Sequence, residues 1–212
     1  MLAAVHEGPG APRRIVYGST PGRYGARGDA TLIAERVVED GAGIQMSLSG
    51  DFGSADLRIG LVGLFNASNA LAVAACWLAL GQPFERVVEA LERLGAGAGR
   101  METLELGDAP LVGVEYAHLP DALDNVLTAL RPIALRRAGR LWCVFGAGGD
   151  RDVGKRAYMG LVAERGADHV VVTSDNPRSE SPFRIVSDIR AGLTREPAIT
   201  ELDRARAIHE AI

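Results

Sequence analysis

The second half of the chain repeats one pattern of hydrophobic and polar positions. A short apolar run is followed by a polar stretch and then by a segment with helical periodicity. The apolar runs are LVGVEYA (111–117), RLWCVFG (140–146) and HVVVTS (169–174), and the helical segments begin near residues 121, 155 and 181. Strands that alternate with helices predict a parallel sheet covered on both faces. We therefore expect an α/β, Rossmann-like domain with a mainly parallel sheet.

The first half has a different pattern. Residues 1–30 are rich in Gly, Pro and Arg with little periodicity, so we expect loops there, and residues 31–62 read as short strands joined by turns. An apolar helix then ends at Gly81, and an amphipathic helix starts at Pro83 and stops at Gly95. Because GAGAGR (95–100) has the composition of a linker, we place a domain boundary between residues 98 and 99.

The position of a ligand site follows from the predicted parallel sheet. In open α/β sheets, ligands bind beyond the carboxyl ends of the strands. The stretches that follow the three predicted strands are EYAHLPD (115–121), GGDRD (148–152) and DNPR (175–178). We expect all three to face one crevice.

The stretch GGDRDVGKR could be mistaken for a phosphate-binding loop. It matches the glycine and lysine positions of that motif at Gly149, Gly154 and Lys155. However, Arg156 stands where a hydroxyl should contact magnesium, and two aspartates in the loop would repel phosphate. A dinucleotide fingerprint fails too, because Arg151 replaces its third glycine.

Charged residues at two strand ends suit a zwitterionic ligand. Arg151 and Arg178 offer forks that pair with a carboxylate, and Asp175 can accept hydrogen bonds from an ammonium group. Two structural alternatives stay open. Asn176 and Pro177 alone would suit a turn, and Arg151 could simply form an ion pair with Asp175.

Four further residues are candidates for a ligand site, and a nucleotide is one ligand that would suit them. Glu115 could accept hydrogen bonds from ribose hydroxyls, and His118 lies beside it at the same strand end, although a lone histidine is more often structural. Asn66 and Asn69 lie at the start of the apolar helix, where one can act as an N-cap and the other could read an adenine edge.

The composition narrows the class of protein. The 212 residues are 47% hydrophobic and 24% charged, with a formal net charge of −4, which is typical of a globular protein. Lys and Arg are scattered, so we expect no nucleic-acid partner, and no apolar run reaches the roughly 20 residues of a membrane-spanning helix. Cys76 and Cys143 lie in apolar segments, so we expect two reduced core thiols in a cytoplasmic protein.

The ordered motifs GLFNASNALAVAA, GRME, EYAHLPDAL, GAGGDRDVGKR and SDNPRSE resemble those of the Mur ligases, and more narrowly the diaminopimelate-adding MurE type. The resemblance runs from about residue 60 to the end. It implies that residues 1–98 are the end of the central ATP-binding domain and that 99–212 are an incomplete C-terminal Rossmann-like domain. It also implies an ATP- and Mg²⁺-dependent ligase that adds meso-diaminopimelate to UDP-N-acetylmuramoyl-L-alanyl-D-glutamate in peptidoglycan synthesis.

The resemblance also assigns nucleotide contacts. It implies that Asn66 and Arg100 contact the adenine nucleotide, that Glu115 lies at its ribose and that His118 lies near the phosphates. Three positions depart from the usual pattern: Glu115 replaces an aspartate, Leu119 a polar residue and Ala147 a cysteine. The longer acid at position 115 puts the nucleotide contact in doubt.

The amino-acid contacts implied by the resemblance are Arg151, Asp175, Asn176 and Arg178, which would grip meso-diaminopimelate. Lysine lacks the distal carboxylate of diaminopimelate and would leave Arg178 without a partner, a loss of roughly 2–5 kcal/mol. No catalytic or metal-binding residue is assigned.

The resemblance further implies that the phosphate loop, the modified lysine and the main magnesium ligands of the family would lie upstream of residue 1. We therefore expect no ADP release from the chain alone. A non-catalytic muropeptide-binding module is the alternative, and a dinucleotide-binding oxidoreductase domain is a weaker one.

Overall fold

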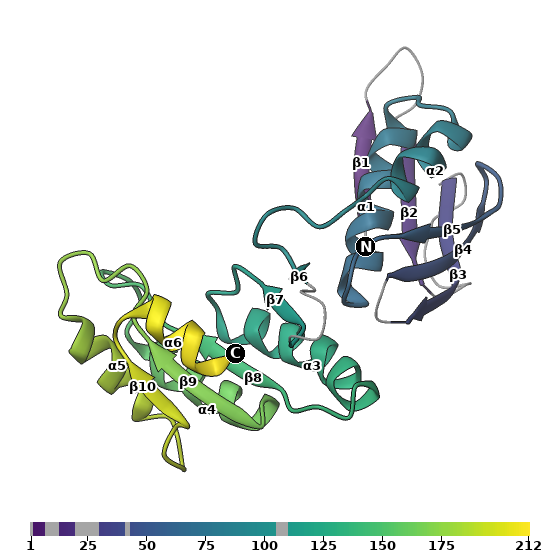
Figure 1. The fold of residues 1–212 in the computed structure, drawn as a ribbon. Coiled ribbons are helices and arrows are strands. Elements are labelled where there is room, and N and C mark those ends of the chain that lie inside the picture. Colours follow the sequence, from purple (N-terminus) through teal and green to yellow (C-terminus); the bar gives the residue numbers. More distant parts are fainter. Residues whose placement is uncertain (1, 7–12, 20–29, 41–42, 105–109) are drawn as a thin grey trace. The chain divides into compact units, whose positions relative to one another are not determined.

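A computed structural model describes residues 2–6, 13–19, 30–40, 43–104 and 110–212. The chain divides into two compact units, residues 1–101 and 102–212 (Figure 1). This division falls three residues after the boundary placed from the sequence. None of the described helices is both long enough and apolar enough to cross a membrane.

The first unit is built on a five-stranded sheet in the order β1-β2-β3-β4-β5. The strands are β1 (Leu2–His6), β2 (Arg13–Gly18), β3 (Ala30–Glu39), β4 (Ile44–Gly50) and β5 (Ala55–Ile59). Neighbours are antiparallel except β2 and β3, which are parallel. Residues 1–30 were expected to be rich in loops, and the structure places the strands β1 and β2 among them. Pairing with β3 through β2 is a tertiary effect that local composition does not show.

Two helices cover this sheet: α1 (Phe65–Ala79) and α2 (Phe84–Glu92). Gly81 ends α1 as predicted, because it adopts a left-handed φ of 81° and its amide donates to the Leu78 carbonyl at 3.0 Å. The Gln82 amide also donates to the Trp77 carbonyl at 3.1 Å, which completes the hydrogen bonding at this helix end. Pro83 is the N-cap of α2, which ends at Glu92, before the predicted stop at Gly95.

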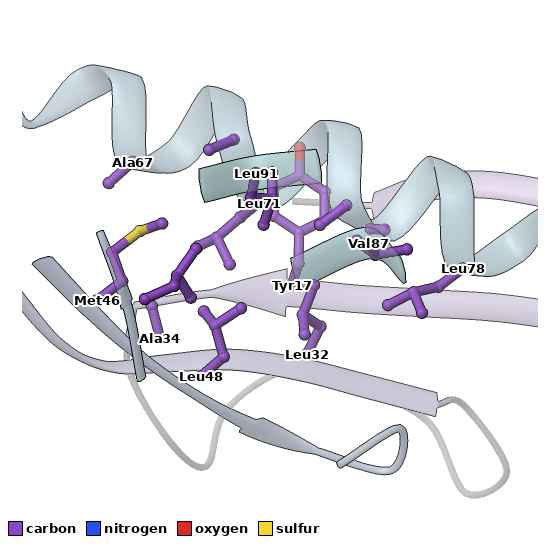
Figure 2. Close-up of a cluster of buried hydrophobic side chains, with 14 of the residues drawn as sticks. Tyr17, Leu32, Ala34, Met46, Leu48, Ala67, Leu71, Leu78, Val87 and Leu91 are labelled. Atoms are coloured by element: carbon purple, nitrogen blue, oxygen red, sulfur yellow. The ribbon is translucent and has the colours of Figure 1, made fainter. Parts of the chain in front are cut away.

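The core of the first unit lies between the helices and the sheet. Figure 2 shows Leu71 and Leu78 of α1 and Leu91 of α2 pointing toward strand side chains such as Leu32. Alanines on the buried face of α1 carry small side chains that let the helix lie close to the strands. The buried side chains of this core lie between residues 15 and 91 of the chain.

The second unit contains a three-stranded parallel sheet in the order β10-β9-β8. Its strands are β8 (Trp142–Phe145), β9 (His169–Thr173) and β10 (Ile199–Glu201), and its helices are α3 (Pro120–Arg136), α4 (Gly154–Gly166), α5 (Pro182–Arg190) and α6 (Arg204–Ala211). The predicted α/β fold with a parallel sheet is confirmed. Helix α6 contacts all three strands (Figure 1). The short strand β10 and helix α6 were not predicted, because a three-residue strand is too short to show a period.

The segment 111–117 does not join this sheet, which corrects one expectation. Only β7 (Val112–Val114) is a strand there, and it pairs antiparallel with β6 (Glu102–Leu104) in a separate two-stranded sheet. Gly113 and Val114 are exposed, whereas a strand in a covered parallel sheet is buried on both faces. The stretch that follows β7 is therefore not positioned by the parallel sheet.

The two cysteines differ from each other. Cys143 is buried in β8, and burial raises the pKa of its thiol to about 12. Cys76 lies on the exposed face of α1, so the expectation of two core thiols was wrong for this residue. The helical period places Ala74, Ala75 and Leu78 on the buried face of α1 and leaves Cys76 outside it.

Candidate functional site

The loops that follow β8 and β9 lie against each other at the carboxyl edge of the parallel sheet. The Gly149 amide donates to the Asn176 carbonyl at 2.9 Å. In return, Nη1 of Arg178 donates to the Gly149 carbonyl at 2.5 Å. Two of the predicted strand-end stretches, GGDRD and DNPR, are thus brought together as predicted.

Close contact between these loops explains the glycines of GGDRD. A Cβ at Gly149 would overlap the Pro177 carbonyl oxygen and lie 2.6 Å from its carbon. A Cβ at Gly146 would lie 2.5 Å from the Thr173 oxygen, and one at Gly148 would lie 3.0 Å from Nη1 of Arg178. Gly146 and Gly149 are therefore required for the approach of the second loop, whereas at Gly148 the end of the flexible Arg178 side chain can move aside.

The same loop does not fit the phosphates of ATP. Its amides are already used: Gly149 donates to Asn176, Asp150 donates to Glu180 Oε1 at 2.6 Å, and Gly154 donates to Asp152 Oδ1 at 2.9 Å. A phosphate cradle needs such amides free. The described residues also contain no group of three or more His, Cys, Asp or Glu side chains arranged to hold a metal ion.

Asp150 and Ser179 join the two loops a second time. The Asp150 carboxylate accepts from the Ser179 hydroxyl at 2.7 Å and from its amide at 3.1 Å. Both hydrogen bonds lower the pKa of Asp150, and the bond from the Ser179 hydroxyl has the larger effect. Asp150 and Arg178 both adopt left-handed backbone angles, with φ of 52° and 49°. Such angles are costly for residues other than glycine, so the contacts between the loops hold both residues in place.

Beneath the loops lies Arg156, which is fully buried on α4. Its guanidinium binds Glu180 through both terminal nitrogens, at 2.7 and 2.9 Å. It also donates to Asp188 at 2.8 Å and to the Gly148 carbonyl at 3.3 Å. The hydrogen bonds from Arg156 lower the pKa of Glu180 to about 2, and Glu180 in turn raises the pKa of Arg156.

The predicted amino-acid contacts Arg151, Asp175 and Asn176 have exposed side chains on these two loops. The alternative in which Arg151 and Asp175 pair with each other is not seen within the described ranges. Arg178 is also exposed and uses Nη1 on Gly149, and its Nε and Nη2 have no partner in the described part of the chain. The site thus presents cationic donors together with one carboxylate and one amide.

Glu115 and His118 lie in the same unit, on the segment between β7 and α3. Oε1 of Glu115 accepts from the Tyr116 amide at 2.9 Å, and a ring nitrogen of His118 lies 3.2 Å from the Tyr116 carbonyl. Nζ of Lys155 donates to the His118 carbonyl at 2.9 Å. This bond ties the segment to the start of α4, next to the loop after β8.

Asn66 and Arg100 belong to the first unit. Asn66 lies in the first turn of α1 after the N-cap Leu64, and its side-chain amide donates to the Val62 carbonyl at 2.7 Å. Asn69 donates to Oδ1 of Asn66 at 3.1 Å, so neither asparagine is the N-cap. Arg100 is exposed in a turn whose backbone closes on Gly97 at 2.9 Å.

Sequence reasoning missed the residues that hold the site. Arg156 was considered only as a mismatch to a phosphate loop, and Glu180 and Ser179 were not considered. A signal existed, because a basic residue in the first turn of one helix and an acid just before the start of the next helix follow adjacent parallel strands. Arg204 was also missed, and it donates to the Ser174 carbonyl at 3.1 Å from the start of α6.

The parallel sheet and its joined loops define the second unit as a Rossmann-like α/β domain. Residues 99–212 match the family model described as "Mur ligase, glutamate ligase domain". The chain therefore belongs to the Mur ligase family.

Two curated relatives named UDP-N-acetylmuramoyl-L-alanyl-D-glutamate–2,6-diaminopimelate ligase are similar over most of the chain. The protein of Acidovorax sp. (strain JS42) is 47% identical over 187 residues, which cover 88% of this chain and 37% of the relative. That of Ralstonia nicotianae is 44% identical and covers 99% of this chain and 43% of the relative. The chain thus spans about two fifths of the length of these relatives.

A solved structure of a ligase with the same name is 35% identical, with a TM-score of 0.53 over 91% of this chain and 38% of that one. Folylpolyglutamate synthase from Mycobacterium tuberculosis aligns with a TM-score of 0.67 at 23% identity, over 85% of this chain and 40% of that one. At that identity the second likeness shows the fold alone.

Proposed function

We propose that the loops after β8 and β9 form the amino-acid site of a ligase that joins meso-diaminopimelate to UDP-N-acetylmuramoyl-L-alanyl-D-glutamate. ATP and Mg²⁺ are proposed for the whole protein, in the cytoplasm, where nucleotide-linked substrates are found. The names of relatives at 44–49% identity support the reaction. The observation that carries the site is the hydrogen bond from Arg178 to Gly149, which places a second loop's guanidinium beside GGDRD.

The charges of these loops suit diaminopimelate. Its distal end carries both an ammonium and a carboxylate. The unused donors of Arg178 and the guanidinium of Arg151 can pair with carboxylates, and Asp175 can accept from an ammonium. The amide of Asn176 supplies a further donor and acceptor. Lysine would satisfy Asp175 and leave one arginine without an anion.

Glu115 and His118 are proposed as contacts of the nucleotide in the same unit, and Asn66 and Arg100 as its contacts in the first unit. Support for the first pair comes from Lys155, whose bond to the His118 carbonyl brings a cation to that segment. Phosphates favour such cationic surroundings.

Calorimetric titration of the chain with meso-diaminopimelate and with L-lysine tests the amino-acid site. We expect saturable binding of diaminopimelate and at least about tenfold weaker binding of lysine, since a lost hydrogen bond to a charged group is worth about 1.5 kcal/mol or more. Arg178→Ala should remove this preference. Arg165→Ala is the matched control, because Arg165 is an exposed cation in the last turn of α4. Equal binding of both amino acids by the unaltered chain would rule out the proposal.

A further inference from the structure

Arg156 has an environment that its role in the fold alone does not explain. Among the residues that the structure describes it is the largest fully buried side chain, and an arginine in that position is costly unless its charge is paired. Its hydrogen bonds go to the two loops of the candidate site and to helix α5. Glu180 and Gly148 belong to those loops, and Asp188 lies on α5.

The geometry of these contacts joins the loops in a chain of bonds. Four hydrogen bonds engage Nη1 and Nη2 of Arg156. Oε1 of Glu180, held by Arg156 at 2.7 Å, also accepts from the Asp150 amide at 2.6 Å. Asp150 then binds Ser179, next to Arg178. One buried guanidinium therefore connects through Glu180 to Asp150, and through Asp150 to Ser179, the neighbour of Arg178. Asp150 and Arg178 are the two residues of these loops that have left-handed backbone angles.

We propose that Arg156, with Glu180 and Asp188, is a positioning residue that holds the loops after β8 and β9 in the arrangement that binds the amino-acid substrate. Arg156 does not touch the substrate. It raises affinity because the loops are already ordered before binding, so little conformational freedom is lost when the ligand arrives. This inference rests on the proposed function for the identity of the ligand.

Arg156→Lys tests the inference, because lysine keeps the charge but cannot form the fork that spans Glu180, Asp188 and Gly148. If the loops of the variant adopt the binding arrangement a tenth of the time, the apparent Kd for meso-diaminopimelate rises about tenfold. Amide hydrogen exchange without ligand gives a second readout. We expect the amides of Gly149, Asp150 and Ser179 to exchange faster, while those paired between β8 and β9 keep their rates.

Arg131→Lys is the matched control. Arg131 also joins a carboxylate and a carbonyl, with bonds of 2.6 Å to Asp168 and 2.6 Å to Gly166. Asp168 accepts from the Leu141 amide, so this pair lies at the amino ends of β8 and β9. The control should leave diaminopimelate affinity and the exchange of the loop amides unchanged.

A variant without the charges covers the case in which Arg156→Lys does not fold. Arg156→Met combined with Glu180→Gln and Asp188→Asn leaves no uncompensated buried charge, and such replacements are often neutral in stability. The same affinity loss and the same selective exchange are expected from it.

Uniform acceleration of exchange in loops and strands would overturn the inference, because it would show a role in stability alone. Unchanged affinity would overturn it as well. Failure of the unaltered chain to bind diaminopimelate would instead remove the proposed function, and the exchange of the loop amides would still decide whether Arg156 holds the loops.

Discussion

Replacing Gly149 with alanine is the sharpest single perturbation of the packed loops. Gly149 does not adopt a left-handed φ, so glycine is required at this position only because the Pro177 carbonyl lies so close to it. A Cβ there would lie 2.6 Å from the Pro177 carbonyl carbon, while ordinary contacts begin at 3.4 Å, so the loops must separate by at least about 0.8 Å. The added Cβ would approach the Pro177 carbonyl oxygen even more closely than the carbon, so the separation must be larger than this, and both the Gly149–Asn176 and the Arg178–Gly149 bonds would be lost.

The size of the effect follows from these contacts. Overpacking costs about 1–3 kcal/mol, and each of the two lost hydrogen bonds costs about 1 kcal/mol. Alanine returns about 1 kcal/mol by restricting the unfolded chain, which leaves a net loss of about 2–4 kcal/mol. For a unit of 111 residues this corresponds to a drop in Tm of about 8–16 °C.

Trp142 provides the assay, since it lies on β8 in the second unit while Trp77 lies in the first. Thermal unfolding of a Trp77→Phe background, followed by fluorescence, reports the second unit. Gly139→Ala is the control, because a Cβ there meets nothing closer than 3.8 Å. It should change the free energy of unfolding by less than about 0.5 kcal/mol or stabilise slightly. Equal Tm values for the two variants would refute the close packing of the loops.

Two further predictions concern stability. Leu71→Ala removes a side chain that is 1% exposed in the first core, so the first unit should lose about 2–5 kcal/mol, measured by Trp77 fluorescence in a Trp142→Phe background, with the second unit unaffected. The pKa of Glu180 in the folded state, about 2, lies below its ordinary value of 4.5. Its contribution to the free energy of unfolding is therefore complete above pH 4.5 and is lost as the pH falls toward 2. Tm should fall across that window, and less steeply for Glu180→Gln; equal slopes would contradict the pairing with Arg156.

The parallel sheet was predictable because its strands β8 and β9 are continuous apolar runs, and each is followed by a helix. The segment 111–117 was misassigned because an apolar run of that length does not reveal its pairing partner, and β6 lies outside the pattern. The strands before residue 20 were missed for the same reason. Their pairing with β3 depends on tertiary contacts.

The candidate site was predictable only in part. Residues that would face a ligand, such as Arg151 and Arg178, could be proposed because they follow strand ends. Arg156 and Glu180, which hold those loops, could not, because their role depends on burial and on contacts across α4 and α5. The glycines of GGDRD were noticed, but the reason for them became clear only when Pro177 was placed against Gly149.

The central claim is that the loops after β8 and β9 form one binding site. Titration of the ¹⁵N-labelled chain with meso-diaminopimelate, followed by amide chemical shifts, tests it most directly. We predict that amides in 146–153 and in 174–180 shift together with one common Kd. Shifts confined to one loop, or shifts of the two loops with different Kd values, would contradict the account.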